Sequence, residues 1–176
     1  MPRLSAIRLT VLLLAVPLCL GSVAQHTNAQ QEAKPNPVDQ YKPHGYVSDF
    51  AGIIDPQIQS KLELICKDLD KTKRTQMAIV TVMTLDGRPV KEFATELANR
   101  WGVGYKDNNR GVLILLSQHD RQYRIAVGFG LESVLTDEEA DRLGREMVPM
   151  LKKGDYGNAL LHLATRIHDE VQQKIK

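Results

Sequence analysis

The fold class is decided by two apolar segments, Gly111–Ser117 (GVLILLS) and Gln122–Gly128 (QYRIAVG). The first is apolar almost throughout, which is typical of a strand buried on both faces. In the second, apolar and polar residues alternate with the period of two that a strand requires. Only the short polar stretch Gln118–Arg121 separates them, so they are predicted to form an antiparallel hairpin.

Upstream of the hairpin, Gln76–Thr84 (QMAIVTVMT) is rich in β-branched residues and predicts another buried strand. A further short strand, near Tyr46 or over Leu131–Leu135, can join the same sheet. Apolar residues at helical spacing predict four helices, which start at Asp55-Pro56, Pro89, the capping box Thr136/Glu139 and about Asp155. This order predicts an α/β fold, a three-layer α/β/α sandwich with a mixed sheet of about four to five strands.

The N-terminal residues resemble a secretory signal peptide. Met1–Arg8 is short and basic, Leu9–Leu20 is nearly all apolar, and Ser22-Val23-Ala24 offers small residues for cleavage. The apolar run is shorter than a bilayer-spanning helix needs. We therefore expect a cleaved signal peptide at residues 1–24, with Thr27-Asn28-Ala29 as an alternative cleavage site.

Residues 25–44 are rich in Gln, Asn, Lys and Pro, which predicts a flexible linker before a folded domain at 45–176. The whole chain has 23 basic and 21 acidic residues. Removal of the leader takes away Arg3 and Arg8 and leaves 21 of each sign, so no electrostatic case exists for nucleic acid as a partner. Cleavage also leaves Cys66 as the sole cysteine, which excludes an intramolecular disulfide, and its helical position predicts an inert buried thiol.

Four segments gather carboxylates, amides and glycines at the ends of predicted elements: 47–55, 101–111, 128–137 and 154–156. Asp, Glu and Asn oxygens suit a hard cation such as Ca²⁺ or Mg²⁺. The structural alternative is that Asp49 bonds nearby amides in a turn, Asn108-Asn109 relaxes a tight turn, and Asp137 complements a helix N-terminus. Motifs for dinucleotide binding, a nucleophile elbow, zinc proteases, P-loops and paired C-x-x-C sites do not occur.

The chain resembles the TPM domain family of exported bacterial proteins and of a plant thylakoid-lumen protein. Four blocks match in order, at Tyr46–Asp55, Trp101–Leu116, Arg124–Asp137 and Gly154–Ala159. The resemblance covers about Tyr46 to Val171 and implies a three-layer α/β/α fold. It also implies a divalent-cation-associated phosphatase activity in some members and an interaction or auxiliary role in the cell envelope for others.

The resemblance assigns residues to the matching positions. Asp49, Asp137 and Arg124 are the catalytic candidates, and Asp49, Asp107, Asn109, Glu132 and Asp137 are the candidate metal ligands. Where many members read Asp-Asn-Gly-Val, this chain reads Asn109-Arg110-Gly111-Val112, so an amide replaces one carboxylate and Asp107 is the substitute.

Two functional hypotheses follow. In the first, the acidic residues converge on Ca²⁺ or Mg²⁺, while Arg110 or Arg124 holds the phosphate of a monoester substrate. In the second, the acidic loops take a structural cation or none, and the domain docks an envelope protein. Either form is expected to be exported, periplasmic or secreted, with no transmembrane anchor in the mature chain.

Overall fold

The computed structural model describes residues 36–175, so the expected signal peptide lies outside the described residues. The strands are β1 (Val47–Asp49), β2 (Gln76–Val82), β3 (Gly111–Ser117) and β4 (Gln122–Val127). The helices are α1 (Pro56–Lys73), α2 (Val90–Trp101), α3 (Asp137–Lys152) and α4 (Tyr156–Lys174), with short 3-10 turns η1 (Pro37–Gln40) and η2 (Phe129–Leu131).

The four strands form one sheet in the order β1-β2-β3-β4. The β1–β2 and β2–β3 pairs are parallel, and β4 runs antiparallel to β3. The predicted hairpin and the mixed α/β sheet are therefore confirmed. The extra strand is the one near Tyr46, whereas Leu131–Leu135 forms no strand because the amides of Val134 and Leu135 both donate to the carbonyl of Leu131, which curls the segment into a turn.

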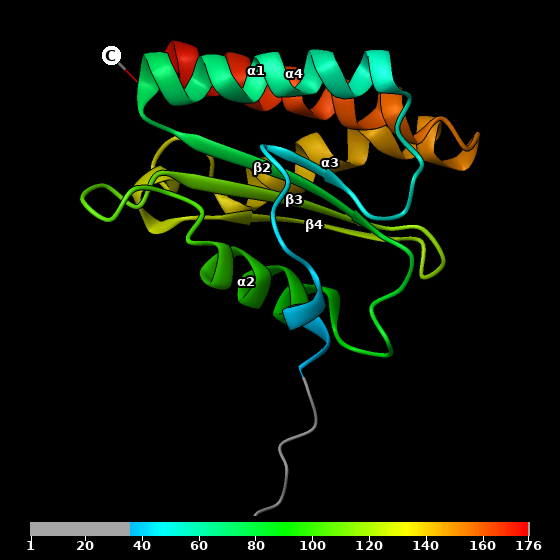
Figure 1. Ribbon diagram of the computed structural model, residues 1–176. Helices are drawn as coiled ribbons and strands as arrows, with labels where there is room; N and C mark the ends of the chain where they lie inside the picture. Colours follow the sequence, from blue (N-terminus) through cyan, green and yellow to red (C-terminus); the bar gives the residue numbers. More distant parts are fainter. Residues whose placement is uncertain (1–35, 176) are drawn as a thin grey trace, which may run out of the picture. The chain divides into compact units, whose positions relative to one another are not determined.

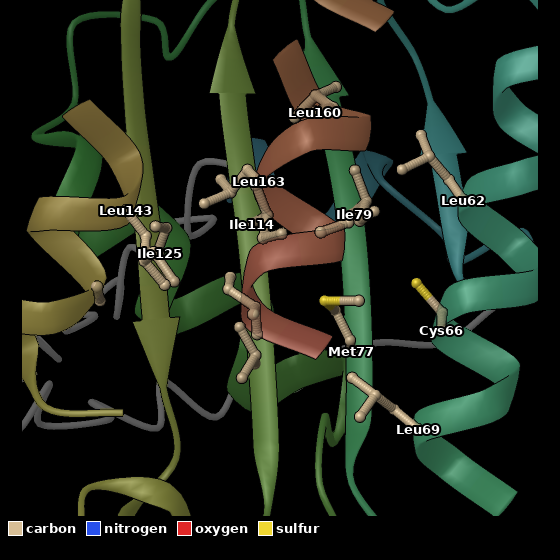
Figure 2. Packing of buried hydrophobic residues seen from close by; sticks show 14 of the residues in the cluster. Leu62, Cys66, Leu69, Met77, Ile79, Ile114, Ile125, Leu143, Leu160 and Leu163 are labelled. Atoms are coloured by element: carbon tan, nitrogen blue, oxygen red, sulfur yellow. The ribbon is translucent and has the colours of Figure 1, made fainter. Parts of the chain in front are cut away.

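Helices cover both faces of the sheet (Figure 1). The alternation along β2 sends Met77 and Ile79 into a core with α1, α3 and α4, and Ala78 and Val80 into a second core with α2. Figure 2 shows Leu62 and Cys66 of α1 directed at this first face of the sheet. These two cores make the middle layer an almost wholly apolar sheet, so polar chemistry is confined to its ends and edges.

Helices α1 and α4 lie side by side on one face and run in the same direction (Figure 1). At their N-terminal ends, a Cβ on Gly157 would lie 3.1 Å from Ile58 Cδ1. At their C-terminal ends, Lys73 Nζ donates to the carbonyl of Ile175 at 2.5 Å. The chain end is thereby attached to the first helix.

The packed unit begins earlier than the expected boundary at residue 45. Val38 in η1 is 1 % exposed and belongs to the core on the α2 side. The indole N–H of Trp101 donates to the carbonyl of Tyr41 at 3.0 Å, and the Tyr41 ring packs edge-on against Phe50. Residues 36–41 therefore pack against the domain, because one buried valine and one aromatic anchor suffice to attach a polar segment. Across the described part of the chain, no helix is both long enough and apolar enough to span a membrane.

Candidate functional site

The predicted site residues lie at different places on the sheet. Asp49 ends β1 at one edge, whereas Arg124 lies in β4 at the other edge. Asp49 is in register with Thr81, which pairs with Leu116, while Asp107 and Asn109 precede the start of β3 at Gly111. Five residues of strand separate these two levels, about 16 Å along the sheet. The structure therefore does not bring Asp49 together with Asp107, Glu132 and Asp137.

Asp49 is occupied by hydrogen bonds within its own turn. Its Oδ2 accepts from the amide of Ile54 at 2.9 Å, and Oδ1 accepts from the amide of Ile53 at 3.2 Å and from the Thr81 hydroxyl. The carboxylate thus fixes the turn from β1 into α1 and links it to β2. This geometry matches the structural alternative for Asp49.

Asp107 is also separated from the other candidates. Its Oδ2 lies 2.8 Å from Arg74 Nη2, and both side chains are more than half exposed. The guanidinium of Arg74 stacks over the Tyr105 ring, with 5.1 Å between Cζ and the ring centroid. Tyr105 in turn donates to Asp70 at 2.5 Å. Asp107 therefore helps to fasten its loop to the end of α1.

The glycines of the two loops serve mutual packing. Asn109 has φ 49°, and its carbonyl accepts from the amides of Gly111 and Gly130. A Cβ on Gly130 would lie 1.8 Å from the carbonyl oxygen of Asn108, and one on Gly128 would lie 2.4 Å from that of Asn109. The two loops approach so closely that only glycine fits, so Asn109 acts as a turn residue that holds the 128–132 loop in place.

Three of the candidates do meet at one pocket. Arg124, Glu132 and Asp137 line a cavity of about 220 Å³ at the edge of the sheet, beneath the N-terminus of α3. The opposite wall is α2, which contributes Lys91, Thr95 and Asn99 at successive turns. Two carboxylates and two cationic groups therefore share one small hollow.

The pocket is organised around Arg124. Its position in β4 alternates with Ile125, which is buried in the core on the other face. Arg124 Nη2 lies 3.1 Å from Asp137 Oδ1, and Nη1 lies 3.6 Å from Asp141 Oδ1, one turn further along α3. Asp137 is the first residue of α3, behind the N-cap Thr136, whose Oγ1 accepts from the amide of Glu139. The N-cap at Thr136 thus determines where α3 begins and where its first carboxylate meets the guanidinium, while the Glu139 side chain of the predicted capping box bonds to Arg142 instead.

The donor set of the pocket restricts the kind of metal that would fit. Within residues 36–175, no group of three or more His, Cys, Asp or Glu side chains is placed to hold one metal ion. A Ca²⁺ cage built from protein oxygens needs six to eight of them, whereas Mg²⁺ is commonly held by one or two carboxylates together with waters and substrate phosphate. Glu132 and Asp137 supply two carboxylates to this pocket, one of which, Asp137, is paired with Arg124.

The contribution of α2 to the pocket is not among the sequence predictions. The sequence predicts this helix from its apolar residues, and Lys91, Thr95 and Asn99 are not among the predicted site residues. Their spacing of four residues is a visible signal, because residues at i, i+4 and i+8 lie on one helix face. What the sequence does not reveal is that this face borders the edge strand that carries Arg124.

Comparison with known proteins is consistent with this architecture. The family model described as TPM domain matches residues 47–170. A chloroplastic UPF0603 protein of Arabidopsis thaliana is 24 % identical over 125 residues, which cover 69 % of this chain and 44 % of the relative. The chain thus spans less than half the length of that curated relative.

Solved structures share the fold. The N-terminal domain of a protein from P. gingivalis matches with a TM-score of 0.70 and 25 % identity, over 74 % of this chain and 84 % of that one. A protein from the psychrophilic bacterium Bizionia argentinensis matches with a TM-score of 0.60 and 15 % identity, over 68 % and 82 %. Because the family model spans most of the chain, including the loops that build the pocket, the protein belongs to the TPM domain family.

Proposed function

We propose that this protein is an exported, Mg²⁺-dependent phosphatase that hydrolyses small phosphate monoesters at the pocket beneath α3. The observation that carries the proposal is that Arg124, Glu132 and Asp137, which lie in one sequence block, line a single cavity together with Lys91. Carboxylates for a divalent cation and cations for a phosphate are the groups that such a reaction requires.

The residues divide into two roles. Glu132 and Asp137 would hold the cation, which supplies Lewis-acid polarisation of a phosphoryl oxygen when bound. Lys91 and Arg124 would hold the phosphate oxygens, and Asp141 keeps the Arg124 side chain extended across the edge of the sheet. Apolar residues line the rest of the pocket, among them Leu113 of β3, Ala98 of α2 and Val103 of the loop that follows α2.

A phosphatase assay on the mature protein tests the proposal. We expect hydrolysis of an aryl phosphate that requires added Mg²⁺ and is abolished by EDTA. Glu132→Gln and Asp137→Asn should each lower kcat/KM by at least about tenfold, since each removes a charged ligand. The matched control is Glu138→Gln, which removes an exposed carboxylate from the same helix turn and should leave the rate unchanged. Equal rates in all three variants would contradict the proposal.

A second candidate function is a non-catalytic interaction module, and the exposure of Phe129 favours it. This side chain is 79 % exposed. The glycines on either side are packed against the backbone of Asn108 and Asn109, so the loop presents the ring in a fixed position. Aromatic residues, Phe included, are enriched in the cores of protein interfaces, so Phe129 is the candidate anchor for an envelope partner.

Capture from envelope extract distinguishes the two functions. If Phe129 is an anchor, the wild-type domain recovers a specific partner and Phe129→Ser loses it. Leu64→Ser is the matched control, because Leu64 is 66 % exposed on the outer face of α1. Recovery of nothing specific, with or without Ca²⁺, would reject the interaction module.

Export is a proposal of its own and is supported by the leader pattern of residues 1–24. Expression with the intact leader in a Gram-negative host should release a mature chain that begins near Gln25 into the periplasm. Mass spectrometry of that fraction locates the cleavage site. Recovery of the full-length chain in the cytosol would reject export.

A further inference from the structure

A second pocket lies at the other end of β3 and has a different chemical character. Its cavity volume is about 640 Å³, within the range of small-molecule sites. It is bounded by the end of β3, the turn to β4, the last turn of α3 and the start of α4. In open α/β sheets, ligands bind beyond the carboxyl ends of the parallel strands, and β3 ends here at Ser117.

The charged residues that line this pocket are all positive. They are Arg121 from the hairpin turn and Lys152 and Lys153 from the end of α3. Among residues 36–175, none of the three forms an ion pair, although most arginines of the same region do. A group of three cations without a direct ion pair in a concave site attracts an anion.

The carboxylates nearest in sequence have other partners. Asp120 Oδ2 accepts from the Ser117 hydroxyl at 2.6 Å and from the amide of Leu85 at 2.7 Å. Asp155 caps α4 and accepts from the side-chain amide of Asn158 at 3.0 Å. Neither of these two carboxylates lines the pocket, although the Ser117 that Asp120 accepts from does.

The interior of the pocket is apolar and aromatic. Leu116, Val148 and Leu151 supply aliphatic surface, and Tyr123 and Tyr156 supply rings. The Tyr123 ring packs against α3 at Gly144, where a Cβ would be 2.6 Å from Tyr123 Cε2. Within residues 36–175 the hydroxyls of Tyr123 and Tyr156 have no hydrogen-bond partner, so both can bond to a ligand.

We propose that this pocket binds an aromatic phosphate ester of nucleotide size, with its phosphate on Arg121, Lys152 and Lys153 and its ring on the apolar floor. The proposal is independent of the phosphatase, because the two pockets lie at opposite ends of β3 and share no residue. Basic residues at the end of α3 also complement the helix dipole. That structural role requires no bound ligand, and the titration described next distinguishes it from ligand binding.

Calorimetric titration with ADP tests the proposal, with adenosine and inorganic pyrophosphate as partial ligands. EDTA is present throughout, so that cation-mediated binding at the other pocket does not contribute. We expect ADP to bind more tightly than either partial ligand, and we expect its affinity to fall as the salt concentration is raised. The double variant Lys152→Gln/Lys153→Gln should lower the affinity for ADP by at least about tenfold. Glu132→Gln should leave that affinity unchanged.

The matched control is Lys61→Gln/Lys67→Gln, which removes two exposed lysines from α1 and should leave the affinity for ADP unchanged. Val148→Glu places a carboxylate within the pocket and should abolish binding without removal of either lysine. Absence of ADP binding to the wild type, equal affinity for adenosine, or equal weakening in the control would each overturn the proposal. Loss of phosphatase activity in Glu132→Gln with ADP binding retained would show that the two sites are separate.

Discussion

The hydroxyl of Thr81 donates a hydrogen bond to Asp49 across the β1–β2 pair, although Thr81 is fully buried and Asp49 ends an edge strand. The same carboxylate accepts the amides of Ile53 and Ile54. Asp49 is thus the acceptor for three donors that have no other partner in this turn. Its role is to join the first strand, the first helix and the second strand.

Replacement of Asp49 by Asn should therefore destabilise the fold without affecting the pocket beneath α3. An amide directs one NH₂ group at donors that need an acceptor, and an unsatisfied buried donor costs about 1–3 kcal/mol. Urea unfolding should show this loss, while Mg²⁺-dependent hydrolysis by the folded protein stays unchanged. Loss of hydrolysis at full stability would instead return Asp49 to the catalytic residues.

A second prediction concerns His168, which joins α4 to α1. Its Nε2 lies 2.9 Å from Asp68 Oδ2, and its Nδ1 lies 3.1 Å from Asp169 Oδ1. Burial lowers the pKa of His168, but the hydrogen bonds and charges of Asp68 and Asp169 raise it more, so the net pKa lies above the ordinary value of 6.5. Protonated histidine therefore stabilises the folded state.

The sign of the pH dependence follows from that shift. The stabilisation is fully present below the unfolded pKa of about 6.5 and is lost as pH rises through the higher folded pKa. We expect the free energy of unfolding to fall over this interval by up to about 1 kcal/mol, the range of partly exposed ion pairs. His168→Gln should flatten the profile, whereas His119→Gln on the exposed hairpin turn should not. A profile that is unchanged in His168→Gln would contradict the assignment.

The fold could be predicted from the sequence because its signals are local. The fully apolar β3, the alternation in β4 and the Thr136/Glu139 capping box each specify an element from a few adjacent residues. The N-terminal boundary of the packed unit could not be predicted in this way. Val38 is one apolar residue in a polar segment, and its burial depends on α2, some fifty residues later.

The candidate site divides in the same way. That Arg124, Glu132 and Asp137 share a pocket follows from one short block, which turns back at the end of β4. That Asp49 lies at the opposite edge depends on the strand order, which the sequence did not provide. The close approach of the two glycine-containing loops also depends on the tertiary structure, because Gly128 and Gly130 lie against the backbone of Asn108 and Asn109, some twenty residues earlier in the chain.

A third prediction tests this close approach at Gly130. Gly130→Ala places a Cβ 1.8 Å from the backbone oxygen of Asn108, and backbone cannot yield as a side chain can. Overpacking of this kind costs about 1–3 kcal/mol, and displacement of the loop should also weaken the proposed binding of Mg²⁺ by Glu132. Gly157→Ala is the control, because its new Cβ meets side-chain atoms of Ile58 at 3.1 Å or more and no backbone atom of another segment. Equal stability of the two variants in urea would show that the loop contact is not rigid.

The last prediction concerns Cys66, whose side chain is fully buried in the core between α1 and the sheet (Figure 2). Burial raises the pKa of the thiol, and the charge of Glu63 raises it further, so the reactive thiolate does not form near neutral pH.

In a Cys19→Ser background, the native protein should not react with a disulfide reagent except at the rate of global unfolding. Labelling should therefore accelerate with urea in parallel with the unfolding rate. Lys67→Cys, an exposed position on the next residue of the same helix, should react at once in the folded state. Fast labelling of Cys66 without denaturant would mean that α1 opens locally from the sheet, and the thiol would then be accessible to chemistry in the folded protein.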